Sequence, residues 1–216
     1  MDPVHSWDDT GPVVADASVW INLVAGGRAQ DILRAFPRPL QIARIALDEL
    51  ERGRDKGRVT AERMEPLIAA GLVEVIELPE SAEEVYLSLV AGPVSQTLDD
   101  GEAATLALAF EVGGTAIIDE RKAIGLAASR FPDLRIISTT DLLVSSRLHS
   151  VLSRGDLGDV LYAALVDARM RVPDRLLDAV CECLGPSRVS DCTSLPSWVR
   201  LAATRISVEI GGTTFP

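Results

Sequence analysis

The chain has 216 residues and a formal charge of −11, from 21 Lys and Arg against 32 Asp and Glu. This length suits one α/β domain with additional helices rather than two full domains, because domains of roughly 100–200 residues are usual. The negative charge argues against non-specific binding of nucleic acid. This argument is weaker if some of the acids hold a divalent ion, because the bound ion reverses the local electrostatic potential that a polyanion meets.

Strand and helix patterns alternate along the chain. Short apolar segments predict strands at 13–15, 40–42, 73–78, 115–118 and 134–138. Apolar residues at helical spacing predict helices at 17–25, 28–36, 43–52, 59–70, 80–91, 99–112, 120–130 and 140–153. Such an alternation predicts an α/β fold with a parallel sheet flanked by helices.

The last two predicted helices carry apolar spacing but no obvious chemistry. Helices are expected at 156–170 and 173–184, where they cover one face of the domain. The predicted organisation is a flexible N-terminus (1–11), a domain over 12–184 with its core at 13–152 and a helical extension at 153–184, and an irregular tail over 185–216. For the tail three alternatives stay open: disorder, a strand at 206–210, or binding to a partner.

The sequence predicts a cytoplasmic protein. Its apolar runs fall far short of the roughly 20 residues that a membrane span needs. The N-terminus lacks the basic start and the apolar stretch of a secretory signal. The three cysteines, Cys181, Cys183 and Cys192, are an odd number without the spacing of a disulfide scaffold, which agrees with a reducing compartment.

Two aspartates follow predicted strands directly. Asp16 ends the strand at 13–15, and Asp119 ends the strand at 115–118. In an open parallel sheet, ligands bind outside the carboxyl ends of the strands, so these two carboxylates are expected to converge. Each also precedes a helix, where Asp is a favoured N-cap, and position alone does not decide between the two roles.

Glu49 lies on the face of its helix that is expected to pack inward. A carboxylate at the edge of a core needs a cation or several hydrogen bonds. Metal binding therefore competes with an ion pair to Arg44 or Arg52 as the explanation of this residue.

Glu102 shares a helical stripe with Leu106 and Ala109, which points its carboxylate toward the sheet. It also stands three residues after Asp99, the spacing of a capping box. Both interpretations stay open from the sequence.

Four carboxylates from four separate segments suit Mg²⁺ or Mn²⁺ held by oxygen ligands and water. Such a site hydrolyses phosphodiester bonds by lowering the pKa of a water, and a second ion about 3.5–4 Å away can stabilise the leaving oxygen. No nucleophilic side chain is then needed.

These segments resemble the motifs of the PIN-domain family. The segment 13–23 (VVADASVWINL) resembles its opening motif, 46–53 (ALDELERG) its second, 98–104 (LDDGEAA) its third and 116–121 (AIIDER) its fourth. Each motif alone is weak, but their order and spacing both fit. The resemblance covers about 13–152 and is expected to include the helices to 184, but not the tail.

The resemblance implies a three-layer fold, with a twisted parallel sheet between helices, and a metal-dependent endoribonuclease that leaves a 5′-phosphate and a 3′-hydroxyl. By that implication Asp16, Glu102 and Asp119 bind Mg²⁺ or Mn²⁺ directly or through water, Glu49 completes the catalytic set, and the Ser18 hydroxyl supports it. Many bacterial members are VapC-like toxins, so an antitoxin partner and a homodimer are also expected. The alternative is a catalytically weak binding or regulatory protein that acts through a protein partner.

Two departures place the chain in a branch with a Gly-Glu-Ala third motif. The third acid is Glu102 where the toxins more often have Asp, and Glu120 follows Asp119 where a second Asp is common. Asp141 offers a fifth acid, but its place in the first turn of a helix is the favoured explanation.

Basic residues near the acids are candidates for RNA contacts. They are Arg52, Arg54, Lys56 and Arg58 after Glu49, together with Arg121 and Lys122 after Asp119. The alternative is a solvated loop whose charges are offset by neighbouring acids. A phosphatase or a receiver domain, which also place Asp after a first strand, fit less well, because position 18 is Ser rather than the second Asp of such phosphatases.

Overall fold

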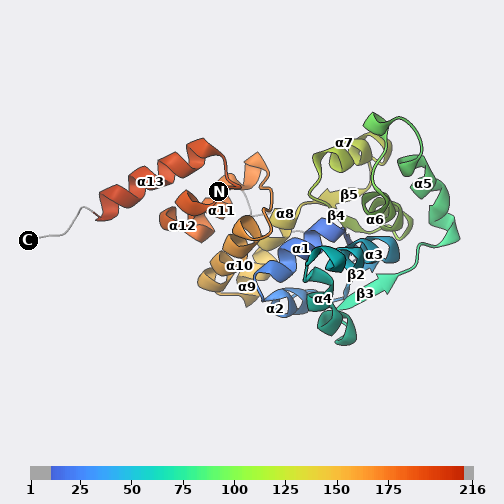
Figure 1. Cartoon of the computed structure of the whole chain (residues 1–216), viewed down its shortest axis with the longest axis horizontal. Coiled ribbons are helices and arrows are strands. Elements are labelled where there is room, and N and C mark those ends of the chain that lie inside the picture. The colour runs from blue at the N-terminus through green and yellow to red at the C-terminus, as the bar shows by residue number, and fades with distance from the viewer. Residues whose placement is uncertain (1–10, 212–216) are drawn as a thin grey trace, which may run out of the picture.

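The structure is a computed structural model that describes residues 11–211, with side chains to residue 205. Apart from Gly11, the flexible N-terminus expected at 1–11 lies outside the described residues. In the described part of the chain, short strands form one parallel sheet in the order β3-β2-β1-β4-β5 (Figure 1). The strands are β1 (Val13–Ala15), β2 (Leu40–Ala43), β3 (Val73–Ile76), β4 (Thr115–Ile117) and β5 (Arg135–Ile137).

Helices connect every pair of consecutive strands. Those between β1 and β5 are α1 (Ala17–Ala25), α2 (Ala29–Arg34), α3 (Arg44–Arg52), α4 (Thr60–Ala69), α5 (Glu80–Val90), α6 (Asp100–Glu111) and α7 (Arg121–Arg130), with 3-10 turns η1 (Arg54–Lys56) and η2 (Val94–Gln96). After β5 follow α8 (Thr139–Leu143), α9 (Ser146–Val151), α10 (Arg154–Val166), η3 (Asp174–Leu176), α11 (Leu177–Leu184), α12 (Pro186–Asp191) and α13 (Ser197–Gly211). The expected α/β fold with a parallel sheet between helices is confirmed.

The strand order shows how the chain crosses the sheet. It moves outward from β1 through β2 to β3 and then returns across β1 to β4 and β5. The direction of the crossovers reverses between β1 and β4. In a sheet of this kind, that switch point is where a ligand crevice opens.

Helix α6 is the most deeply buried helix in the region of the sheet. Its sequence is rich in alanine, and these small side chains let its backbone approach β1, β2 and β4 closely. Leu106 and Leu108 are fully buried in this layer, and each contributes roughly 1.5–3 kcal/mol by leaving water. Trp20 of α1 is also fully buried, and its indole N–H donates to the Ala15 carbonyl at 3.1 Å.

The segment after β5 differs from the prediction in two places. The single helix expected at 140–153 is divided into α8 and α9, because Ser145 adopts an extended conformation and its hydroxyl accepts a hydrogen bond from Leu148 N–H as the N-cap of α9. The irregular tail expected from 185 is wrong where it is described. Gly185 ends α11 with a φ of 77°, and Pro186 begins α12, which are the usual signals of a helix end and a helix start.

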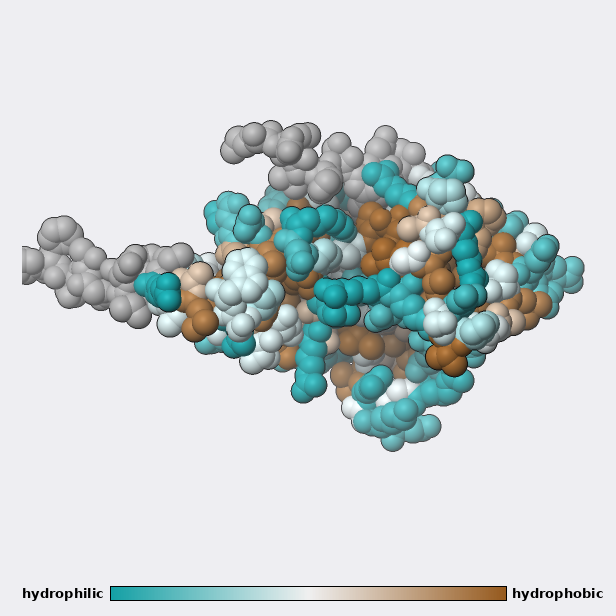
Figure 2. Space-filling view, turned by 90° about the horizontal axis from the view of Figure 1, so that it is seen from above, coloured by the Kyte–Doolittle hydropathy of each residue, from teal (hydrophilic) through white to brown (hydrophobic). Residues whose placement is uncertain are grey.

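Helix α13 covers the segment in which a strand was one alternative for the tail, and it extends away from the rest of the domain (Figure 1). Val199 and Ala203, one turn apart, are buried together with Val189 and Leu195. The face in Figure 2 shows hydrophobic residues interspersed with hydrophilic ones. Among the described residues, no helix is long and apolar enough to cross a membrane.

Candidate active site

Asp16 and Asp119 lie at the carboxyl ends of the two central strands, on either side of the switch point. Asp16 directly follows β1, and Asp119 follows β4 after one residue. The paired register of Ala15 with Ile117, continued by the hydrogen bond from Asp16 N–H to the Ile117 carbonyl at 3.1 Å, places the two segments side by side. The sheet therefore brings both aspartates to one edge, as their positions in the sequence predict.

Asp16 is also the N-cap of α1. Its Oδ2 accepts hydrogen bonds from the Ser18 backbone N–H at 3.1 Å and from the Ser18 hydroxyl at 2.7 Å. The side chain is buried, with only 5% of the residue exposed. Burial raises the pKa of Asp16 and the Ser18 hydrogen bonds oppose that shift. Asp16 thus both caps α1 and places a carboxylate at the edge of the sheet, and Ser18 orients this carboxylate.

Asp119 is held by donors on both oxygens. Its Oδ1 accepts from the Thr139 N–H at 2.8 Å, and its Oδ2 accepts from the Thr139 hydroxyl at 2.6 Å and from the Asn22 side-chain amide at 2.8 Å. Burial raises the pKa of Asp119, and the hydrogen bonds from Thr139 and Asn22 lower it. Helices α1 and α8 together therefore fix the orientation of this carboxylate.

Glu49 connects α3 to the start of α6. Its Oε1 accepts a hydrogen bond from the Gly101 N–H at 3.0 Å. A Cβ atom at position 101 would lie 2.8 Å from Glu49 Cδ, so the Glu49 carboxylate would have to shift to make room for it. Burial, followed by the negative charge of Asp99, raises the pKa of Glu49. A backbone donor, rather than Arg44 or Arg52, is the hydrogen-bond partner of this inward-facing carboxylate.

Glu102 follows the N-cap of α6. The Asp99 carboxylate accepts from the Glu102 N–H at 2.9 Å, so Asp99 is the cap. The Asp99 N–H lowers the pKa of Glu102, although the two residues do not form a complete capping box. Burial, and then the charges of Asp99 and Asp16, raise the pKa of Glu102 to about 7. Its carboxylate is the least compensated of the four.

The four predicted acids line one pocket of about 360 Å³. Two further acids, Asp99 and Glu120, line it as well, and both are helix N-caps. The other lining residues are Ala17, Ser18, Ile21, Asn22, Leu50, Arg58, Ala168, Arg169, Met170 and Arg171. The pocket thus collects carboxylates from four segments that are far apart in the sequence.

The donor set suits a hard divalent cation in its chemistry. All the acidic ligands offer oxygen, and their raised pKa values reflect burial and mutual repulsion, which a cation relieves. Among the described residues, however, no three acidic, histidine or cysteine side chains are close enough to hold one ion between them. This arrangement fits Mg²⁺ or Mn²⁺, which keeps several waters and takes one or two carboxylates plus substrate oxygens, better than a cation enclosed by protein ligands.

Asp141 does not line this pocket. Its carboxylate completes a capping box with Ser138 at the start of α8 and accepts two hydrogen bonds from Arg175, one of them at 2.7 Å. Although burial opposes it, these interactions with Arg175 and Ser138 lower the pKa of Asp141. Its first-turn position accounts for this residue, and no metal role is needed.

Of the basic residues that the sequence predicted near the acids, only one lies on the pocket. Arg58 lines the pocket, whereas Arg52, Arg54, Lys56, Arg121 and Lys122 do not. Arg54 pairs with Glu65, and the Lys122 ammonium donates to the Val94 carbonyl. The other arginines on the pocket, Arg169 and Arg171, come from the loop after α10.

Sequence reasoning also missed the two residues that hold Asp119. Asn22 is one helical turn beyond Ser18, so helical spacing places it on the site-facing side of α1. Thr139 follows β5, the strand beside β4, and its position at the carboxyl end of that strand was the available signal.

Comparison with known proteins points to a single family. The profile of the DUF3368 family, described as a PIN domain, matches residues 12–185. A solved structure with a similar fold is that of VapBC2 from Rickettsia felis bound to a DNA fragment from their promoter. The likeness covers 58% of this chain and 97% of that chain, at 15% identity and a TM-score of 0.43, which is too weak to bear on substrate or partner. No curated protein matches the chain.

Proposed function

Because the chain belongs to the PIN-domain family, we propose that it is an endoribonuclease that uses Mg²⁺ or Mn²⁺ to hydrolyse RNA phosphodiester bonds. The observation that carries the proposal is the pocket at the switch point of the sheet, lined by Asp16, Glu49, Glu102 and Asp119. Burial, which raises the pKa of all four carboxylates, makes them costly to retain without a cation.

Each residue has a distinct part in this proposal. Asp16, Glu102 and Asp119 hold the ion directly or through water, and Ser18 keeps Asp16 oriented. Glu49 positions the start of α6, and with it Glu102, through the Gly101 N–H. What a divalent ion supplies when bound is a lower pKa for water and compensation of the negative charge on the phosphate.

A binding or regulatory protein with a weak catalytic site is the alternative function. Such a site normally loses a carboxylate to a neutral residue. The four acidic positions are all retained here, and Ser18, Asn22 and Thr139 orient two of them through hydrogen bonds. This supports hydrolysis over the alternative.

The test compares the wild type with Asp16→Asn on mixed cellular RNA in Mn²⁺, Mg²⁺ or EDTA, with sequencing of the 5′-phosphate ends produced. Asparagine still caps a helix well, so the variant removes charge with little change in fold. Asp133→Asn is the matched control, because Asp133 is exposed and precedes β5 at the opposite edge of the sheet. Cleavage that needs metal, disappears in Asp16→Asn and persists in Asp133→Asn supports the proposal; RNA left intact under all conditions, without stabilisation of the protein by metal, sinks it.

A toxin role with an antitoxin partner is a finer proposal, supported by the family resemblance of the motifs. Induced expression of the wild type should slow bacterial growth, and Asp16→Asn should not. Unchanged growth with the wild type, alongside metal-dependent cleavage in vitro, would remove the toxin role and leave the nuclease.

A further inference from the structure

Three arginines from two loops lie on the pocket that contains the acids. Arg58 belongs to the loop between α3 and α4, and Arg169 and Arg171 belong to the loop between α10 and η3. All three are exposed. Within residues 11–205, where side chains are described, none of their guanidinium groups has an ion pair or a hydrogen bond. Their charges are therefore available to a ligand.

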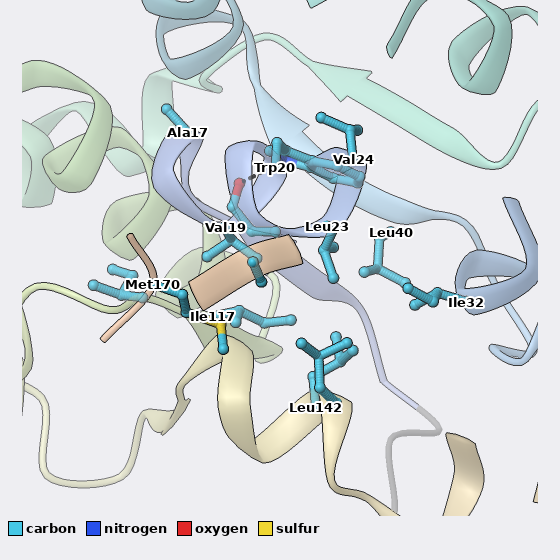
Figure 3. Packing of buried hydrophobic residues seen from close by; sticks show 14 of the residues in the cluster. Ala17, Val19, Trp20, Leu23, Val24, Ile32, Leu40, Ile117, Leu142 and Met170 are labelled. Carbon is cyan, nitrogen blue, oxygen red and sulfur yellow. Dashed lines mark hydrogen bonds between the residues drawn. The ribbon is translucent and has the colours of Figure 1, made fainter. Parts of the chain in front are cut away.

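The loop that carries Arg169 and Arg171 is anchored on both sides. Met170 lies between them, is only 2% exposed, and belongs to the same buried cluster as Val19 and Ile117 (Figure 3). The Met170 N–H donates to the Ala164 carbonyl at 2.8 Å, and the Arg171 carbonyl accepts from the Thr140 hydroxyl at 3.3 Å. The buried methionine thus fixes two arginine positions at the pocket.

Arg169 has an unusual backbone conformation. Its φ of 57° is in the left-handed region, the only such non-glycine residue in the described part of the chain. A residue with a Cβ atom is strained in this conformation, and the end of a helix normally uses Gly or Asn for it. Helix capping alone does not favour arginine here, so its side chain needs another explanation.

We infer that Arg58, Arg169 and Arg171 bind phosphate groups of the RNA strand that enters the pocket. This inference rests on the proposed function and adds the contacts by which a chain of net charge −11 holds a polyanion. Carboxylates alone repel the substrate, whereas a guanidinium presents a planar set of donors that matches phosphate. Aromatic residues make up only 4% of the chain, so backbone contacts, rather than stacking of bases, are expected to dominate binding.

The experiment measures binding of a fluorescent, unstructured single-stranded RNA in Mn²⁺ at several salt concentrations. The background is Glu102→Gln, so that hydrolysis does not consume the probe. The test variant adds Arg169→Gly and Arg171→Ala, since glycine accepts the left-handed φ at position 169. The control variant adds Arg38→Ala and Arg135→Ala, because both residues are exposed and lie at the amino ends of β2 and β5, away from the pocket. Both variants lose two positive charges, so long-range electrostatics change equally.

The test variant should bind about tenfold more weakly than the background. The slope of log K against log salt should become shallower by roughly 0.7 for each lost phosphate contact. The control should stay within about twofold, and the melting temperatures of both variants should show that they are folded. Equal weakening in test and control, or no weakening in either, overturns the inference, as does the absence of RNA binding to the background protein.

The inference and the proposed function fail in different ways. RNA binding that depends on Arg169 and Arg171, in a protein whose wild type cleaves nothing, leaves the arginine contacts standing and removes the nuclease. Cleavage by the wild type, together with RNA binding that does not depend on Arg169 and Arg171, supports the nuclease and removes the arginine contacts.

Discussion

At the scale of single residues, the acids of the pocket differ in how well their charge is compensated. Asp119 accepts three hydrogen bonds and Asp16 two. The Glu102 carboxylate has only weak support from the Asp99 N–H, and the charges of Asp99 and Asp16 lie nearby. In the metal-free protein, the charge of Glu102 is therefore expected to lower the free energy of unfolding, although the same charge is the one that binds a cation.

Glu102→Gln should stabilise the metal-free protein at pH 8. The folded-state pKa of about 7 lies above the ordinary value of 4.5, so the charged form destabilises the folded state. This destabilisation is absent below pH 4.5, grows as pH rises toward 7, and is complete above it. Since the side chain is only about half buried, the gain is expected to be about 1 kcal/mol after allowance for solvent screening.

The measurement is chemical denaturation in EDTA at pH 8 and pH 4.5. The variant should gain stability only at the higher pH, and Mn²⁺ should then raise the melting temperature of the wild type more than that of Glu102→Gln. Glu84→Gln, on the exposed face of α5, is the control and should change neither quantity. A Glu102→Gln protein that is less stable than the wild type at pH 8 would contradict this account.

The sequence could place a residue on the pocket where neighbouring residues determine its position, and could not where contacts between distant segments do. Asp16 and Asp119 could be placed because a strand precedes each of them. Glu49 and Glu102 could be placed by helical spacing, but their final roles depend on Gly101 and Asp99. Arg169 could not be found, because its place on the pocket depends on a loop held by the burial of Met170, a contact between segments distant in the sequence.

At the scale of elements, the start of α6 is coupled to α3 through Glu49 and Gly101. The Gly101 N–H donates to Glu49 at 3.0 Å, and a side chain at position 101 would displace the Glu49 carboxylate from this position. Alanine favours helix over glycine by about 1 kcal/mol, so a purely local view predicts that Gly101→Ala stabilises the protein. The contact with Glu49 reverses that expectation.

Gly101→Ala should therefore lower the free energy of unfolding by about 1 kcal/mol, as overpacking usually does, and reduce RNA cleavage at least about tenfold because a misplacement near 1 Å has effects of this size or larger. Gly125→Ala is the control. It lies within α7, its Cβ meets nothing within 4 Å, and it should stabilise the protein by roughly 0.5–1 kcal/mol without affecting cleavage. Equal behaviour of the two variants would show that Glu49 yields without consequence.

A second coupling between elements joins α8 to η3 through Asp141 and Arg175. Asp141→Asn should lower the free energy of unfolding at pH 7 by about 1 kcal/mol, the usual contribution of a hydrogen bond, because it weakens the capping box with the N-cap Ser138, and the half-exposed Arg175 adds little. The folded-state pKa of Asp141 lies below 3.8. The stabilisation is therefore complete above that unfolded-state value and is lost as the pH falls through the folded-state pKa.

Denaturation of the wild type, Asp141→Asn, Arg175→Ala and the double variant at pH 7 and in acid separates the cap from the ion pair. The cap should account for most of the loss at pH 7, and the wild type and Asp141→Asn should converge in acid. A difference between them that persists at the acid end would mean that shape, rather than charge, makes Asp141 stabilising.

At the scale of the whole molecule, the family match includes every residue of the pocket but not the last two helices. The family profile stops at residue 185, and the last residue on the pocket is Arg171. Beyond this point, α12 and the turn that leads to α13 add their own buried residues, Val189, Cys192 and Leu195. The sequence predicts an irregular region here because Pro186, Pro196 and Gly211-Gly212 are typical of turns and chain breaks. Their packing against α11 and each other, which no local pattern encodes, makes them helical.

A chain truncated after Gly185 should therefore keep the site and lose stability. Removing α12 and α13 exposes the face of α11 that carries Leu177 and Cys181, which line a common pocket with Val189 and Val199. A loss of roughly 2 kcal/mol corresponds to a fall of about 4–8 °C in melting temperature for a domain of this size. The increase in melting temperature on adding Mn²⁺ should be unchanged, because every residue on the pocket is retained. The measurement is thermal unfolding of both chains with and without Mn²⁺. A truncated chain that unfolds cooperatively but no longer responds to Mn²⁺ would show that the C-terminal helices act on the site, and that the domain is larger than the family match.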